Sequence, residues 1–199
     1  MAFLCASYAD SRLTFARVTF ARGFVQQTVE KAIQPPPISS AEKRTIATFE
    51  NRLKAYMKLR NRIKEKLPKL SKDSTPEQIE SFRKSFEEQM RAARTGVKSG
   101  DIFRAGAAAY IRKTLRTEFQ GKDRAELRNI VFEAETQGVP LRVNYAYPEA
   151  KEFTEMPATL LAKLPPLPKE VRYRFVGRNM LLIDRDNNLI IDYMVDALP

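Results

Sequence analysis

Three aspartates near the C-terminus are the first residues that could do chemistry: Asp184, Asp186 and Asp192. Clustered carboxylates can serve as general acid and general base in a hydrolase. The chain contains no histidine and a single cysteine, Cys5. This composition excludes histidine-dependent dyads and triads, and the usual zinc and iron–sulfur sites within one chain. A carboxylate-dependent hydrolase-type enzyme that uses the three aspartates is therefore one hypothesis for the function.

The segment 184–188, Asp-Arg-Asp-Asn-Asn, has the spacing with which a calcium loop of the EF-hand type begins. Such a loop needs Gly at its sixth position and Glu at its twelfth, where this chain has Leu189 and Val195. Asp and Asn are also preferred in β-hairpin turns, because they tolerate positive φ and hydrogen-bond to their own backbone. We therefore predict a turn over residues 184–188, between strands at about 179–184 and 189–194, and no calcium site.

The sequence contains none of the common glycine-rich motifs for phosphate binding or hydrolysis, G-x-x-x-x-G-K-[ST], G-x-G-x-x-G and G-x-S-x-G. We therefore assign no catalytic, cofactor-binding or metal-binding residue from the sequence, and we favour a protein that is not an enzyme.

Positive charge is concentrated in one segment of the chain. The formal net charge is +11, and residues 43–72 alone carry eleven Lys or Arg and two acidic residues. Within this segment Lys54, Lys58, Arg62 and Lys66 recur every four residues, so they lie along one face of a helix. This face, the basic stripe, is either a solvated surface or a binding face for a protein or anionic partner. Nucleic acid is one such partner, although the stripe lacks the aromatic residues on which single strands stack.

Capping signals predict the helices that position the stripe. Ser39 with Glu42, and Thr75 with Gln78, have the spacing of capping boxes. They predict one helix that ends before Pro68 and a second that ends near Gly96, and the short loop between them predicts an antiparallel helical hairpin. Each helix has one apolar stripe, and we expect the two stripes to pack together. Arg60 is the only residue that interrupts the stripe of the first helix. The residues of the two stripes are Ile46, Phe49, Leu53, Tyr56 and Ile63, and Ile79, Phe82, Phe86 and Met90.

Further helices are predicted over about 102–120, 123–138 and 157–164. Alternating apolar residues predict a short strand at 141–145 and a three-stranded antiparallel β-meander after residue 170. In this meander we expect Arg172, Arg174 and Arg178 to lie on the solvent-facing side of the sheet. The sequence therefore predicts an α+β fold.

The proline run 35–37 is a stiff spacer that divides the chain. We expect an N-terminal arm or targeting-like segment over 1–37 and a single α+β domain over 38–199, with a helical part at 38–138 and a β-containing part at 139–199. Arginines interrupt every apolar run in residues 1–34, so the arm contains no clear signal peptide, and no run is long enough to cross a bilayer.

The C-terminal block 164–178, LPPLPKEVRYRFVGR, and the following 189–193, LIIDY, resemble a family of uncharacterised bacterial proteins that usually begin with an export signal. Residues 94–103 and 139–144 are similar to the middle of the same family. The resemblance implies a common fold unit and a periplasmic or secreted location, but no activity. Members often have Pro-Glu where this chain has Arg104-Ala105, so we expect the third helix to begin with a weaker cap.

The leading interpretation is a non-enzymatic binding or structural module of an exported or envelope-associated bacterial protein. Two alternatives from other classes remain open, the carboxylate-dependent hydrolase and a nucleic-acid or anionic-polymer binder that uses the basic stripe.

Overall fold

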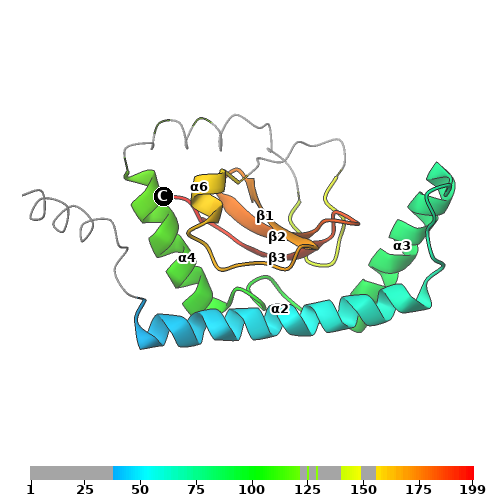
Figure 1. Cartoon of the computed structure of the whole chain (residues 1–199), viewed down its shortest axis with the longest axis horizontal. Helices are drawn as coiled ribbons and strands as arrows, with labels where there is room; N and C mark the ends of the chain where they lie inside the picture. The colour runs from blue at the N-terminus through cyan, green and yellow to red at the C-terminus, as the bar shows by residue number, and fades with distance from the viewer. Residues whose placement is uncertain (1–37, 122–124, 126–128, 130–139, 149–155) are drawn as a thin grey trace, which may run out of the picture. The chain divides into compact units, whose positions relative to one another are not determined.

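The computed structural model describes residues 38–121, 125, 129, 140–148 and 156–199. In this part of the chain, helices α2 (Ser40–Lys66), α3 (Pro76–Ala93) and α4 (Arg104–Phe119) precede the short helix α6 (Ala158–Leu161) and a three-stranded sheet (Figure 1). The predicted α+β fold is confirmed. The predicted arm and most of the predicted fourth helix lie outside the described residues. None of the helices in the described ranges has the length and apolar character to cross a membrane.

Both predicted capping boxes are present. The Ser39 side chain accepts a hydrogen bond from the backbone of Glu42, whose carboxylate accepts one from the Ser39 backbone, and Thr75 and Gln78 do the same for α3. These bonds satisfy amide groups that the first turn of a helix leaves unpaired. Helix α4 has no such side-chain cap at Phe103.

Helices α2 and α3 form a hairpin that is open at its loop. Figure 1 shows α3 approaching α2 at its C-terminal end and rising away from it toward residue 76. Arg60 and Lys64 of α2 bind Asp186 in the turn between β2 and β3, and this turn also shares a hollow with α3. The turn is therefore bound to α2 and borders the same hollow as α3.

The apolar stripe of α2 serves more partners than α3 alone. Phe49 stacks on Phe103 with the ring centroids 5.9 Å apart, and Phe82 stacks on Phe86 within α3. Arg60, which interrupts the stripe in the sequence, is only 2% exposed. The longest helix thus contributes its buried face to α3, to the start of α4 and to the sheet.

The sheet is an antiparallel meander of β1 (Val171–Val176), β2 (Asn179–Asp184) and β3 (Ile190–Met194), in that order. It confirms the predicted strands, and Asn188 in the predicted turn has φ 50°, as turn residues of this kind often do. Strand β2 is central and almost completely buried.

Both faces of the sheet contribute to apolar clusters. One face joins the main core with the helices, and the other joins a smaller cluster around Tyr147. Arg172 and Arg174 lie opposite Ile183 and Leu181, and they are half-buried, while Arg178 is exposed. The expectation of a fully solvent-facing side is therefore wrong for the first two arginines, because β2 needs cover on both faces.

The strand predicted at residues 141–145 is not formed. Asn144 has φ 65°, which is incompatible with an extended strand, and only an isolated bridge joins Ala146 to Leu189. The segment is instead anchored by two backbone hydrogen bonds, from Asn144 N–H to the carbonyl of Ile190 and from Ile190 N–H to the carbonyl of Tyr145. The alternating apolar residues correctly indicated that this segment packs against the protein, but they did not predict its backbone conformation.

Candidate functional site

The three aspartates singled out by the sequence do not converge on one site. Asp184 and Asp186 bind α2, whereas Asp192 binds the loop before α4. Among the described residues, no group of three His, Cys, Asp or Glu side chains could hold a metal ion.

Asp184 is fully buried at the end of β2 and is surrounded by donors. Arg60 donates from Nε to Oδ2 at 2.5 Å and from a terminal nitrogen to Oδ1 at 3.3 Å. Tyr56 donates its hydroxyl to Oδ2 at 3.1 Å, and the Asp186 backbone N–H donates to Oδ1 at 3.1 Å. Burial and the neighbouring Asp184 carboxylate hold the pKa of Tyr56 well above its usual value. A carboxylate so fully bonded is a structural anchor between α2 and the sheet.

Asp186 bridges Arg60 and Lys64 at the mouth of the hairpin. Its Oδ2 accepts from Arg60 at 2.6 Å and from Lys64 Nζ at 2.8 Å. Partial burial opposes ionisation of Asp186, but the hydrogen bonds from Lys64 and Arg60 outweigh it and keep the pKa of this carboxyl below its usual value. The second aspartate therefore also fastens the turn to α2.

Asp192 accepts four backbone N–H groups. Its Oδ1 lies 2.7 Å from the nitrogen of Gly100 and 2.8 Å from that of Tyr193, and its Oδ2 lies 2.7 Å from Ile102 and 2.9 Å from Phe103. Burial nevertheless outweighs these bonds and raises the pKa of the carboxyl. A carboxylate at the N-terminal end of a helix also interacts favourably with the helix dipole. Asp192 therefore supplies from β3 the cap that the start of α4 lacks, next to Arg104 with φ 41°.

A second buried arginine fixes the segment that replaces the predicted strand. Arg94 is 8% exposed and donates to the side-chain oxygen of Asn144 at 2.5 Å and to the carbonyl of Ile191 at 3.0 Å. Its guanidinium also lies 5.2 Å from the centre of the Tyr56 ring. Buried polar side chains thus connect α2, the end of α3 and the sheet. In the sequence, only the position of Arg60 within an apolar stripe indicated that such a network exists.

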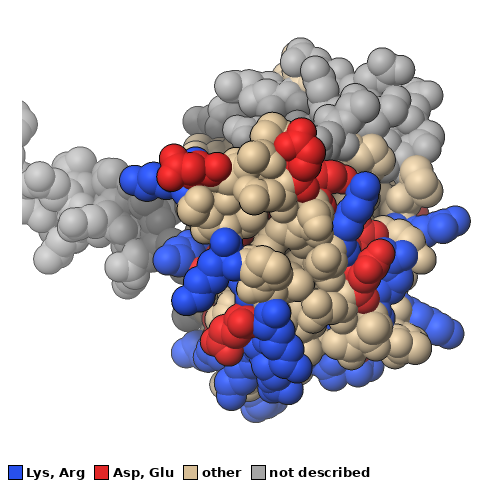
Figure 2. All heavy atoms as spheres, turned by 90° about the vertical axis from the view of Figure 1, so that its right-hand side faces the viewer, with Lys and Arg blue, Asp and Glu red and all other residues tan. Residues whose placement is uncertain are grey.

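The basic stripe lies on the solvent-exposed face of α2. Lys54, Lys58, Arg62 and Lys66 are all exposed, and none of them forms an ion pair within the described ranges. Other cations of the same helix are paired, since Arg52 binds Asp101 and Lys64 binds Asp186. Figure 2 shows Lys and Arg gathered along the lower part of the molecule, where α2 lies in Figure 1. The four stripe residues remain available to an anionic partner.

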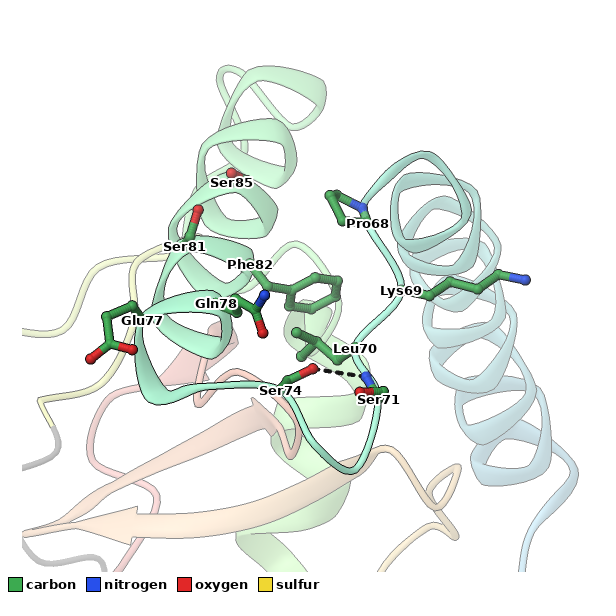
Figure 3. A pocket seen from close by; sticks show the side chains of 10 residues that line it. All are labelled: Pro68, Lys69, Leu70, Ser71, Ser74, Glu77, Gln78, Ser81, Phe82 and Ser85. Carbon is green, nitrogen blue, oxygen red and sulfur yellow. Dashed lines mark hydrogen bonds between the residues drawn. The ribbon is translucent and has the colours of Figure 1, made fainter.

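The open end of the hairpin contains two adjoining hollows that share Pro68, Lys69, Leu70 and Phe82. The first, which we call the serine hollow, has a volume of about 410 Å³. Figure 3 shows Phe82 extending from α3 toward the Pro68–Leu70 segment, with Leu70 beside its ring, and the hydrogen bond from Ser71 to Ser74 closing the loop beneath. Leu70 is 41% exposed, so apolar surface remains accessible here.

The second, which we call the amide hollow, has a volume of about 450 Å³ and opens toward the turn between β2 and β3. Ile79, Phe82 and Leu70 give it apolar walls, and Asn187 of the turn also lines it. Asn187 is 6% exposed, and neither its side-chain nitrogen nor its side-chain oxygen has a hydrogen-bond partner in the described protein. The sequence identifies Asn187 only as a turn residue and contains no signal that its amide would be unpaired.

Comparisons of the chain with protein-family models, curated proteins and solved structures give no match.

Proposed function

We propose that this protein is a non-enzymatic binding module that holds an acidic protein segment against the exposed face of α2. The observation that carries the proposal is the contrast along one helix. Cations that face the protein are paired with carboxylates, whereas Lys54, Lys58, Arg62 and Lys66 have no such partner in the described ranges. Successive stripe residues are about 6 Å apart along a helix axis, because each residue rises about 1.5 Å. Carboxylates with the same spacing on a partner segment would match them.

Two features favour a protein partner over nucleic acid. The exposed large apolar residues of the described chain include Tyr145 as their one aromatic member, and its ring is covered by Arg91 at 4.2 Å. The stripe therefore presents no aromatic platform for stacked bases. Near the C-terminal end of the stripe, Lys64 and Lys69 line a hollow with apolar walls from Leu70, Ile79 and Phe82, and such walls suit an amino-acid side chain better than a phosphate backbone.

The test uses a labelled oligoglutamate peptide and two variants of equal charge. The stripe variant carries Lys54→Gln, Lys58→Gln, Arg62→Gln and Lys66→Gln. The control variant carries Lys98→Gln, Arg116→Gln, Lys163→Gln and Lys169→Gln, which are exposed positions elsewhere on the chain. We expect fluorescence anisotropy to show salt-dependent binding by the natural chain, an affinity loss of at least about tenfold in the stripe variant, and little change in the control.

Equal losses in both variants would mean that the peptide responds only to net charge and would overturn the proposal. A DNA or RNA oligonucleotide measured in parallel addresses the main alternative. Tight oligonucleotide binding that depends on the stripe, without binding of the peptide, would assign the face to nucleic acid instead.

We further propose that the module acts in the bacterial envelope, outside the cytoplasm. This proposal is supported by the resemblance of the tail block to proteins that carry an export signal. Cell fractionation combined with mass spectrometry of the native N-terminus tests it. Recovery of the intact chain only in the cytoplasmic fraction would refute it.

A further inference from the structure

A third hollow, which we call the proline hollow, shares no residue with the two hollows of the hairpin. It has a volume of about 720 Å³ and is lined by α6, by the segment 164–169 and by the first part of β1. This volume is within the usual range of ligand sites, roughly 300–1,000 Å³. In its wall, Leu161 is 47% exposed and Leu167 is half-buried. The proline hollow therefore presents apolar surface that the described residues leave open.

The backbone of this wall has few groups left for hydrogen bonding. Pro165, Pro166 and Pro168 have no backbone N–H. The carbonyl of Pro165 already accepts from the Tyr173 hydroxyl at 3.0 Å. The carbonyl of Pro168 accepts from the Val171 N–H at 2.9 Å. A peptide against this wall would lose water from its own N–H and C=O groups without gaining partners, which costs free energy. A hydrocarbon chain has no such groups, so the wall favours an acyl chain over a peptide.

The charges that line the proline hollow are all positive. They belong to Lys169, Arg172, Arg174 and Arg185, and no described Asp or Glu lines this hollow. The two hollows of the hairpin differ in this respect, since each contains one carboxylate. Arg172 and Arg174 are half-buried and already bonded within the protein. The charge available to a ligand therefore comes from Lys169 and Arg185.

Lys169 and Arg185 are neighbours at this hollow. The Arg185 guanidinium donates to the carbonyl of Lys169 at 3.3 Å. Both side chains are exposed, and neither forms an ion pair with a described residue. The flexible Lys169 side chain can reach an anion that Arg185 binds. Because like charges repel each other, an anion bound by both cations relieves their repulsion. The rim of the apolar wall thus suits one anionic head group.

We propose that the proline hollow binds a fatty acid, with its acyl chain against the proline-rich wall and its carboxylate bound by Arg185 and Lys169. This site does not depend on the proposed function, because no residue of the basic stripe lines the hollow. It gives the chain a second ligand, whose apolar part is a hydrocarbon chain rather than a peptide.

The experiment titrates cis-parinaric acid, a fluorescent fatty acid, into the full chain below the concentration at which the acid forms micelles. The methyl ester of the acid is the uncharged counterpart. Leu161→Asp places a charge in the apolar wall, and Val195→Asp, at an exposed apolar position elsewhere, is its matched control. We expect saturable binding of the acid, with an affinity loss of at least about tenfold in Leu161→Asp and little change in Val195→Asp.

The head group is tested by a second variant, Lys169→Gln with Arg185→Gln. Its control of equal charge is Lys98→Gln with Arg116→Gln, at exposed positions outside the hollow. We expect the first variant to lose at least about tenfold in affinity for the acid, and the control to bind as the natural chain does. The ester should bind the natural chain more weakly than the acid does. Thermal melting checks that every variant folds.

Three outcomes would overturn this inference. The first is binding of the acid that neither Leu161→Asp nor the variant without the two cations weakens. The second is equal affinity for the acid and its ester, because the cations would then select nothing. The third is displacement of the acid by the oligoglutamate peptide, which would assign the hollow to a polypeptide. The stripe variant should bind the acid as the natural chain does, so a failure of the proposed function leaves this site standing.

Discussion

The Arg60 side chain of α2 binds Asp184 of β2 across 124 residues of sequence, with Nε 2.5 Å from Oδ2. Both side chains are almost completely excluded from solvent, at 2% and 0% exposure. Burial opposes a charge on Arg60, but the hydrogen bond and charge of Asp184 outweigh it and raise the pKa of the guanidinium. This pair fastens the helical part of the protein to its sheet.

Arg60→Met should lower the free energy of unfolding by about 3–5 kcal/mol, because it leaves the Asp184 carboxylate buried without its main partner. Urea denaturation followed by circular dichroism measures the loss. Arg62→Met, one of the exposed stripe positions, is the control and should change stability by less than about 0.5 kcal/mol. The double variant Arg60→Met with Asp184→Leu should lose less than the two single losses combined. Additive losses would show that the pair is not coupled.

Asp192→Asn should destabilise the start of α4. An asparagine keeps one acceptor oxygen, so two of the four N–H groups that Asp192 accepts would face an amide nitrogen. At about 1–3 kcal/mol for each buried donor left unpaired, we expect a loss of roughly 2–6 kcal/mol. Hydrogen exchange should report faster opening at Gly100, Ile102 or Phe103. Asp196→Asn, whose side chain is 77% exposed, is the control, and an equal loss there would contradict the capping role.

Glu42 should contribute stability that disappears in acid. The hydrogen bond from Lys113, followed by those from Ser39, lowers the pKa of Glu42 to about 2. Because this pKa is below that of the unfolded chain, the contribution is complete above about pH 4.5 and is lost as the pH falls through about 2. Glu42→Gln retains a capping residue but not the charge. We expect it to be less stable than the natural chain at pH 7, with a difference that shrinks as the pH falls toward about 2, in unfolding curves measured across this range. A stability difference that stays constant from pH 7 to about pH 2 would contradict the ionic contribution.

Calcium should leave the melting temperature unchanged at millimolar concentration. A calcium ion requires six to eight oxygens at about 2.3–2.6 Å, and the oxygens of Asp184 and Asp186 already accept from Arg60, Lys64 and Tyr56. Thermal melting with and without the ion decides the point. A saturable rise of the melting temperature that Asp186→Asn abolishes would show that calcium displaces the Arg60 and Lys64 side chains from the turn.

The parts of the fold that the sequence predicted correctly are governed by local rules. Ser39 with Glu42 and Thr75 with Gln78 lie within one turn of each other, and the alternation from Val171 to Phe175 lies within one strand. The interactions that form these features join residues only a few positions apart, so the local sequence is sufficient to predict them.

The parts that the sequence did not predict depend on partners far along the chain. The basic stripe could be predicted because exposure follows from helical spacing. The partner of Arg60 could not be predicted, and neither could the role of Asp192 as a remote cap nor the unpaired amide of Asn187. The polar residue in the apolar stripe of α2 was the one available signal, since a charge on a buried face requires a partner.

The long separation between Arg60 and Asp184 also determines when this protein can fold during its synthesis. Ribosomes add roughly 5–20 residues each second, so the 124 residues between the two partners correspond to roughly 6–25 seconds. During this interval the nascent helices carry an arginine whose native place is buried and an apolar face without its sheet. We expect the chain to complete its fold only after β2 and β3 have been made. A chain that stays open so long is exposed to proteases and chaperones, and it is also in the condition that a translocation machinery for unfolded chains requires.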